Sequence, residues 1–185
     1  MTQSKILVDT NAYLRLAKTI RPLLFNPFGD NGYCLYILPE LNTELTHNRL
    51  VTKFYWIEED EYLENRKHFP ALSKKQRKDI DITFSYVWGY VQTDLPGPSK
   101  VDALYIAYAI ELNIPVVTDD QDMTALAHVF EAKVMPTLAL LKIMLDCAHT
   151  DMKTIDGLVD YWRHIGDRPA NLDVDYEHFF SVYKS

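Results

Sequence analysis

Two short aliphatic segments constrain the fold most, because each is followed directly by acidic residues and then by a helical pattern. The first, residues 6–8, ends at Asp9, and the second, residues 114–118, runs into the acidic segment 119–122. Short apolar segments that alternate with amphipathic helices are typical of a parallel β-sheet covered by helices. Ligands bind such sheets outside the carboxyl ends of the strands. The sequence therefore predicts an α/β fold with acidic side chains gathered at one edge of the sheet.

Hydrophobic periodicity and turn residues divide the rest of the chain into further elements. Strands are predicted at residues 33–38 and 133–135. Helices are predicted after Asp9, at 39–45, two or three times between 47 and 92, and at 99–113, 123–130, 136–145, 154–162 and 176–183. The character of the sequence changes near Ala148. We therefore expect one domain over residues 1–149 and a helical C-terminal extension over 150–185 that packs on or beside it.

Composition limits the class of protein. The 185 residues carry a net charge of −7, which argues against a protein that simply coats nucleic acid, although not against an enzyme that acts on it. Cys34 and Cys147 lack zinc-site spacing and are expected to be buried free thiols in a reducing compartment. The N-terminus lacks a signal-peptide pattern, and no apolar run approaches about 20 residues. We therefore expect a cytoplasmic protein without a membrane anchor.

Four blocks carry acidic residues in a distinctive order. They are residues 6–11 with Asp9 and Asn11, residues 39–45 with Glu44, residues 100–109 with Asp102, and residues 115–123 with Thr118, Asp120 and Asp122. In this order the blocks resemble those of the PIN domain family, metal-dependent nucleases that include many toxins of bacterial and archaeal toxin–antitoxin pairs. The resemblance covers residues 5 to about 135. It implies a three-layer α/β/α sandwich around a central parallel sheet, and Mg²⁺- or Mn²⁺-dependent hydrolysis of RNA phosphodiester bonds.

The resemblance also implies a set of site residues. The expected catalytic acids are Asp9, Glu44, Asp102 and Asp120, and the expected ligands of one or two ions are Asp9, Asp102, Asp120 and Asp122. Several carboxylates without a histidine or cysteine pattern suit Mg²⁺ or Mn²⁺ better than zinc. Asn11 and Thr118 are expected to hydrogen-bond the acids and orient them.

Helix capping is the structural alternative for two of these acids. Asp9 could cap the first helix, but we expect Thr10 or Asn11 to do so, because both are good N-cap residues. Ser99 and Asp102 have the spacing of a capping box, in which the acid hydrogen-bonds back to the first residue. The sequence leaves open whether Asp102 caps its helix, binds metal or does both.

Two neighbouring acids are given structural roles. Glu40 competes with Glu44 for the second block, but its place in the first helical turn suits an interaction with the helix dipole. Asp119 is expected to be solvated or part of a turn.

Candidate partners follow from charge and from the resemblance. RNA phosphates would need positive charge near the site, and the candidates are Arg15, Arg49, Lys53, Lys100 and the basic stretch 66–78. The C-terminal segments 154–162 and 176–183 could cap the core, form a homodimer or bind an antitoxin protein. Two other functions remain open: a catalytically silent PIN-like module that binds RNA or protein, and a phosphohydrolase for small substrates.

Overall fold

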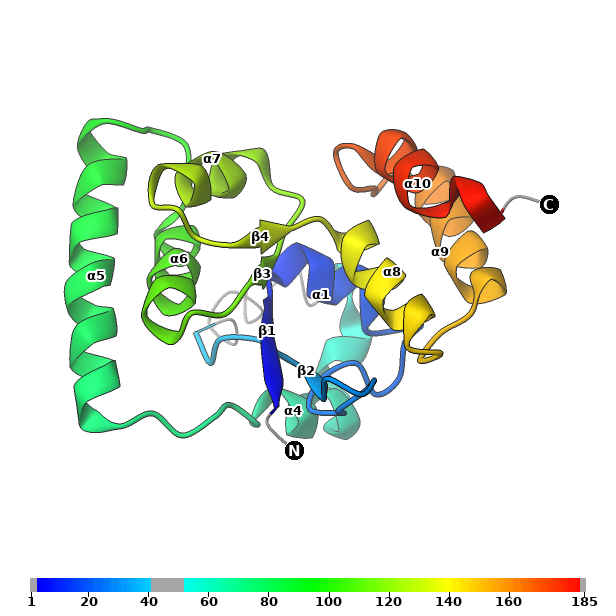
Figure 1. Cartoon of the computed structure of the whole chain (residues 1–185), viewed down its shortest axis with the longest axis horizontal. Helices are drawn as coiled ribbons and strands as arrows, with labels where there is room; N and C mark the ends of the chain where they lie inside the picture. Colours follow the sequence, from blue (N-terminus) through cyan, green and yellow to red (C-terminus); the bar gives the residue numbers. More distant parts are fainter. Residues whose placement is uncertain (1–2, 41–51, 184–185) are drawn as a thin grey trace.

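The computed structural model describes residues 3–40 and 52–183. Its centre is a parallel sheet of four strands in the order β2-β1-β3-β4 (Figure 1). The strands are β1 (Ser4–Val8), β2 (Tyr33–Tyr36), β3 (Val116–Val117) and β4 (Val134–Met135). The predicted α/β fold with a parallel central sheet is confirmed.

Helices lie on both sides of this sheet, as Figure 1 shows. On one side are α5 (Lys74–Thr93), α6 (Lys100–Leu112) and α7 (Gln121–Val129). On the other are α1 (Thr10–Leu16), α8 (Thr137–Asp146), α9 (Met152–Ile165) and α10 (Leu172–Phe180). Shorter elements are η1 (Tyr55–Glu58), α4 (Asp60–Arg66) and η2 (Ser181–Tyr183). No helix in the described ranges is long and apolar enough to cross a lipid bilayer.

Both faces of the sheet are buried, which explains the unbroken apolar run in β1. Ile6 and Val8 belong to the hydrophobic cluster on the side of α1 and α8, whereas Leu7 belongs to the cluster on the side of α5 and α6. Successive side chains of a strand point to opposite faces, so the part of β1 that is covered on both faces, residues 6–8, is entirely apolar.

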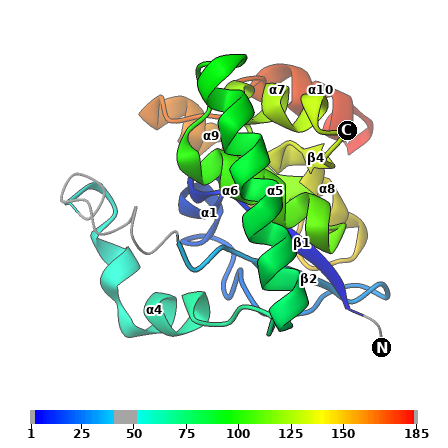
Figure 2. The ribbon, with the colours of Figure 1, turned by 90° about the vertical axis from the view of Figure 1, so that its left-hand side faces the viewer.

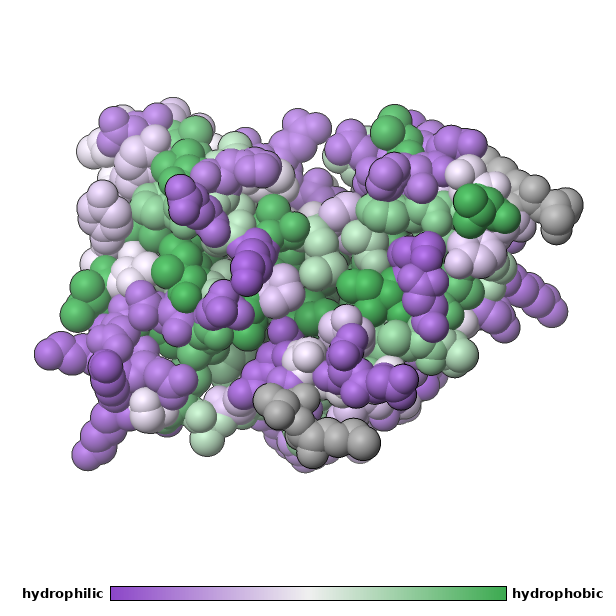
Figure 3. Space-filling model, viewed as in Figure 1, coloured by the Kyte–Doolittle hydropathy of each residue, from purple (hydrophilic) through white to green (hydrophobic). Residues whose placement is uncertain are grey.

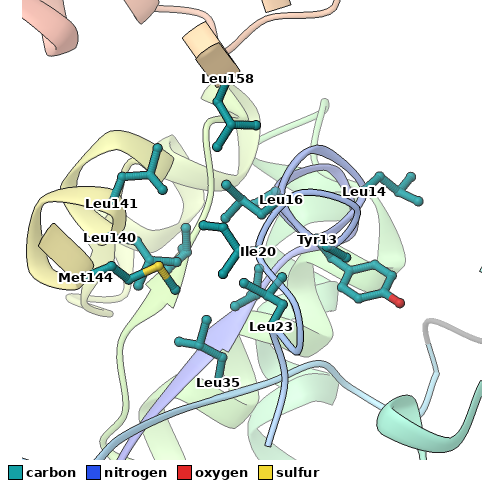
Figure 4. Close-up of a cluster of buried hydrophobic side chains, with 14 of the residues drawn as sticks. Tyr13, Leu14, Leu16, Ile20, Leu23, Leu35, Leu140, Leu141, Met144 and Leu158 are labelled. Atoms are coloured by element: carbon teal, nitrogen blue, oxygen red, sulfur yellow. The ribbon is translucent and has the colours of Figure 1, made fainter. Parts of the chain in front are cut away.

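The C-terminal extension contributes to the same core. Leu158 of α9 lies near Leu16 of α1 and Leu141 of α8 in Figure 4, and all three side chains are buried. Trp162 and Phe180 are also fully buried in this cluster. The extension therefore shares a hydrophobic core with the first domain.

Some element boundaries differ from those predicted, mainly because capping residues start helices early. Helix α7 begins at Gln121, two residues before the prediction, because Asp120 caps it. Helix α9 likewise begins after its cap Asp151. Strand β3 has only two residues, because the ladder ends where β1 ends. Of the helix predicted at 39–45, residues 39 and 40 form a turn, and residues 41–45 lie outside the described residues.

Candidate functional site

The sheet reverses its strand order between β1 and β3, because β2 and β3 lie on opposite sides of β1. Val8 pairs with Val117, and the Asp9 amide donates to the Val117 carbonyl at 3.0 Å. Asp9 and Thr118 therefore lie side by side just beyond the carboxyl ends of the two central strands. Such a switch point is where open α/β sheets bind their ligands.

A cavity of about 460 Å³ opens at this point. Four predicted site acids and the predicted Asn11 line it. Its walls are Asp9, Thr10, Asn11, Gly97, Ser99, Val101, Asp102, Tyr105, Asp120 and Asp122. They come from the beginnings of α1, α6 and α7 and from the loop before α6. Three helix starts that are distant in sequence thus place four carboxylates around one cavity.

Asp9 is buried, with 6% of its surface exposed, and both carboxylate oxygens accept hydrogen bonds. Oδ1 accepts from the Ala12 amide at 2.6 Å, so Asp9 is the N-cap of α1. Oδ2 accepts from the Thr118 hydroxyl at 2.6 Å. The expectation that Thr10 or Asn11 would cap the helix is therefore wrong, because α1 already includes both residues. The expected contact between Thr118 and an acid is present.

Burial raises the pKa of Asp9 from 3.8 to about 6. The hydrogen bonds from Thr118 and the Ala12 amide favour the ionised form and oppose this rise. The nearby Asp119 carboxylate adds to the rise, and the Arg15 guanidinium opposes it. The ionised side chain is thus incompletely compensated, and a cation in the cavity would supply the missing positive charge.

Asp102 and Asp120 also cap helices at the cavity. Asp102 Oδ2 accepts from the Ser99 amide at 2.6 Å and the Ser99 hydroxyl accepts from the Asp102 amide, so the predicted capping box is present. Asp120 is the N-cap of α7, and its Oδ1 accepts from the Met123 amide at 2.9 Å. The positive ends of α1, α6 and α7 therefore face the carboxylates and offset part of their mutual repulsion.

Asp122 lies in the first turn of α7 opposite the loop before α6. A Cβ atom on Gly97 would come within 3.0 Å of the Asp122 Cγ, and Gly97 has φ +152°. Glycine at position 97 thus allows the loop to approach the carboxylate closely. Gly97 was not among the predicted site residues, although its Pro-Gly-Pro context already indicated a turn.

Tyr105 is a second lining residue that was not predicted. It is buried, and its hydroxyl donates to the Val8 carbonyl at 2.9 Å and accepts from the Leu38 amide at 3.4 Å. It therefore ties α6 to the residue immediately before Asp9. In the sequence Tyr105 is one of several aromatic residues at helical spacing, which indicates only a core position.

Asp119 is not the solvated residue that was expected. Only 5% of its side chain is exposed, and it accepts hydrogen bonds from the Thr137 amide at 2.9 Å and hydroxyl at 2.6 Å. The Arg15 guanidinium pairs with it at 3.4 Å and with Asp167 at 3.3 Å. Asp119 therefore anchors the start of α8, and the charge of Arg15 is engaged within the protein.

The other predicted RNA contacts have different positions. Lys53 pairs with Asp167 at 2.6 Å, and neither residue lines the cavity. Lys100 is exposed at the start of α6, and its ammonium lies 5.9 Å from the centre of the Phe84 ring. Glu44 and Arg49 lie outside the described residues.

The cavity offers only oxygen donors, which is the donor set that Mg²⁺ and Mn²⁺ take. The residues present therefore fit a hard divalent cation in their chemistry. Within residues 3–40 and 52–183, no three or more His, Cys, Asp or Glu side chains are placed so that they could hold a metal ion as they stand.

No protein-family model matches the chain, and no curated protein matches it.

Proposed function

We propose that this protein is a metal-dependent endoribonuclease that hydrolyses RNA phosphodiester bonds. One observation carries the proposal: Asp9, Asp102, Asp120 and Asp122 line a single cavity at the switch point of a parallel sheet. A cavity lined by several carboxylates repels a phosphodiester unless a cation lies between them. Hydrolysis of an anionic substrate at such a site therefore requires bound metal.

These four acids would hold one or two Mg²⁺ or Mn²⁺ ions, with Glu44 as a further catalytic acid. A divalent ion in such a site lowers the pKa of bound water and neutralises charge on the phosphate. Thr118 orients Asp9 through its 2.6 Å hydrogen bond. The positive ends of α6 and α7 would help the metal by offsetting part of the negative charge of the acids.

Cleavage of RNA tests the proposal. Mixed single-stranded oligonucleotides are incubated with the full chain and Mn²⁺, with and without EDTA. We expect cleavage that EDTA abolishes and that Asp9→Asn lowers by at least about a hundredfold. Asp151→Asn is the matched control, because Asp151 caps α9 away from the cavity. Equal cleavage by Asp9→Asn and the wild-type chain would refute the role of Asp9.

A catalytically silent module that binds RNA or protein is the second candidate. The observation that favours it is that Asp9, Asp102 and Asp120 each serve as a helix cap, which is sufficient reason for their presence. RNA binding without metal-dependent cleavage in the same assay would support this candidate. Hydrolysis confined to small phosphate esters would instead support a phosphohydrolase.

We also propose that the protein acts as the toxin of a toxin–antitoxin pair. This role rests on the family resemblance alone. Co-expression with the product of an adjacent small gene tests it, because an antitoxin should restore the growth of cells that the wild-type protein inhibits. An Asp9→Asn chain should not inhibit growth in the first place.

A further inference from the structure

The outer face of α5 carries the strongest unpaired positive charge among the described residues. Four cations occur within its first five residues: Lys74, Lys75, Arg77 and Lys78. All four are exposed, and none forms an ion pair with a described residue. Figure 3 shows hydrophilic side chains gathered at the lower left, over the first turns of α5. This basic turn stands out in a chain whose net charge is −7.

The position of this charge is unfavourable for the helix itself. Cations at a helix N-terminus oppose the helix dipole, and Lys74 and Lys78 are like charges at i,i+4 spacing. The first turn of α5 contains no acidic residue. Asp79 and Asp81 offset part of the charge one turn later, but neither forms an ion pair with these cations. Because these cations destabilise the start of their own helix, we expect them to bind a negatively charged partner.

An exposed stripe continues from the basic turn along α5. Lys75, Lys78, Ile82 and Tyr86 are spaced by three or four residues, so they share one face of the helix. Ile82 is 58% exposed and Tyr86 is 72% exposed. Beyond them a Cβ atom on Gly89 would meet nothing within 4 Å, so the stripe remains open there. Figure 2 shows this helix at the front of the molecule, with no other labelled element covering it.

The helix that carries this stripe ends a few residues before the loop that lines the candidate site. The 20 residues of α5 span about 30 Å. The loop that follows α5 contributes Gly97 and Ser99 to the cavity wall. Two of the basic residues expected to approach RNA, Arg15 and Lys53, are instead paired with acids of the protein. This face of α5 therefore offers unpaired positive charge and the exposed ring of Tyr86, which also makes a T-shaped contact with Phe130, and a short loop joins the helix to the cavity wall.

We propose that this face of α5 is a track for single-stranded RNA. The basic turn contacts phosphates, the Tyr86 ring stacks against a base, and the strand continues to the cavity. Cations that track a phosphate backbone and an aromatic side chain that stacks on bases are the two elements of single-strand binding. The proposed nuclease function supplies the reason for the strand to reach the cavity, but binding along α5 does not depend on cleavage.

Binding is measured by fluorescence anisotropy with a labelled RNA of about 20 nucleotides, in EDTA, on Asp9→Asn chains. The test variant is Lys74→Gln/Lys75→Gln/Lys78→Gln. The control is Lys18→Gln/Lys133→Gln/Lys153→Gln, which removes the same charge from exposed lysines elsewhere. We expect the test variant to bind at least about tenfold more weakly and its log-log salt slope to decrease by about 2, with the control within about twofold of the parent.

Thermal unfolding shows that a loss of binding is not a loss of folding. Removing the cations from the first turns of α5 should raise the melting temperature, because it relieves their repulsion with the helix dipole. Tyr86→Ala should weaken binding at least about fivefold, whereas Tyr86→Phe should retain it, because the ring performs the stacking.

Equal RNA affinity in the two lysine variants would overturn the proposal. The basic face of α5 would then be a candidate binding site for an acidic protein instead. The failure of the two proposals can be told apart. If the lysine test variant loses RNA binding but the wild-type protein cleaves no RNA, only the nuclease function is rejected. If the wild-type protein cleaves RNA with metal but the lysine test variant binds RNA as well as its parent, only the proposed RNA track is rejected.

Discussion

The Thr118 hydroxyl donates a 2.6 Å hydrogen bond to Oδ2 of Asp9, and so joins the carboxyl ends of the two central strands. The same hydroxyl oxygen accepts from the Asp120 amide at 3.1 Å. A single buried side chain thus fixes the position of one site acid and the backbone of another.

Replacing Thr118 by valine should therefore destabilise the protein in a pH-dependent way. The buried Asp9 carboxylate loses a donor, which costs about 2 kcal/mol when the group is ionised. The loss should be largest above pH 6 and should shrink toward pH 4, where Asp9 is protonated. Urea unfolding at several pH values measures it. Thr118→Ser, which keeps the hydroxyl, should lose clearly less, and a pH-independent loss would contradict this assignment.

Asp9 should make the metal-free protein less stable as the pH rises. A carboxyl with a raised pKa binds protons more tightly in the folded chain than in the unfolded chain, so stability falls between about pH 4 and pH 6 and levels off above. The shift from 3.8 to about 6 corresponds to about 3 kcal/mol. Asp9→Asn keeps the helix cap and should remove this decline. Urea unfolding of both chains in EDTA at several pH values measures this decline. Identical pH profiles of the two chains would disprove the role of Asp9.

Divalent metal should stabilise the wild-type chain through the cavity acids. A ligand that binds only the folded state raises the melting temperature by mass action. We expect millimolar Mn²⁺ to raise the melting temperature of the wild type and of Asp151→Asn, and to raise that of Asp120→Asn less. Both variants exchange an N-cap aspartate for asparagine, so their caps are matched. Equal Mn²⁺ shifts in the two variants would exclude Asp120 as a ligand.

Arg15→Gln should be much more damaging than the loss of a surface ion pair. Arg15 joins the nearly buried Asp119 to Asp167, and truncating it leaves the Asp119 carboxylate with less compensation. We expect a loss of about 2 kcal/mol in the free energy of unfolding. Lys142→Gln, which breaks the more exposed pair with Asp146, should change it by no more than about 0.5 kcal/mol. Denaturant titrations that give similar losses for both would show that Asp119 is stabilised by other groups.

Gly97→Ala should impair the site more than the fold. Its Cβ atom would approach the Asp122 Cγ to 3.0 Å, and φ +152° is strained for alanine. We expect at least about tenfold less Mn²⁺-dependent cleavage from a displacement of Asp122. Gly157→Ala is the control, because a Cβ atom there meets nothing within 4 Å inside α9. That change should stabilise the protein by about 0.5 to 1 kcal/mol and leave cleavage unchanged.

Local patterns in the sequence predicted the elements near the cavity well. The apolar run before Asp9 and the capping box of Ser99 and Asp102 depend only on neighbouring residues, and both are present in the structure. The predicted alternation of strands and helices also yields the parallel sheet. These patterns involve residues only a few positions apart, so they can be predicted from the sequence alone.

Contacts between segments that are distant in sequence could not be predicted in the same way. The burial of Asp119 depends on Thr137, 18 residues further along, and Arg15 finds Asp167 across 152 residues. The prediction that Thr10 or Asn11 caps α1 was wrong for the same reason, because Asp9 is an equally good N-cap type and local sequence does not separate the three. Tertiary geometry selected Asp9, since its other oxygen meets Thr118 from β3.

The double use of carboxylates as helix caps has a consequence for reading the evolution of this protein. Under the proposed nuclease function, a relative that lost catalysis would still be under selection for a capping side chain at positions 9 and 120, so an acid at these positions is weak evidence of activity. Asparagine and serine cap a helix as well as aspartate does, but they carry no charge. Replacement of aspartate by either residue at these two positions would therefore identify relatives that keep the fold but lack the proposed metal-binding charge.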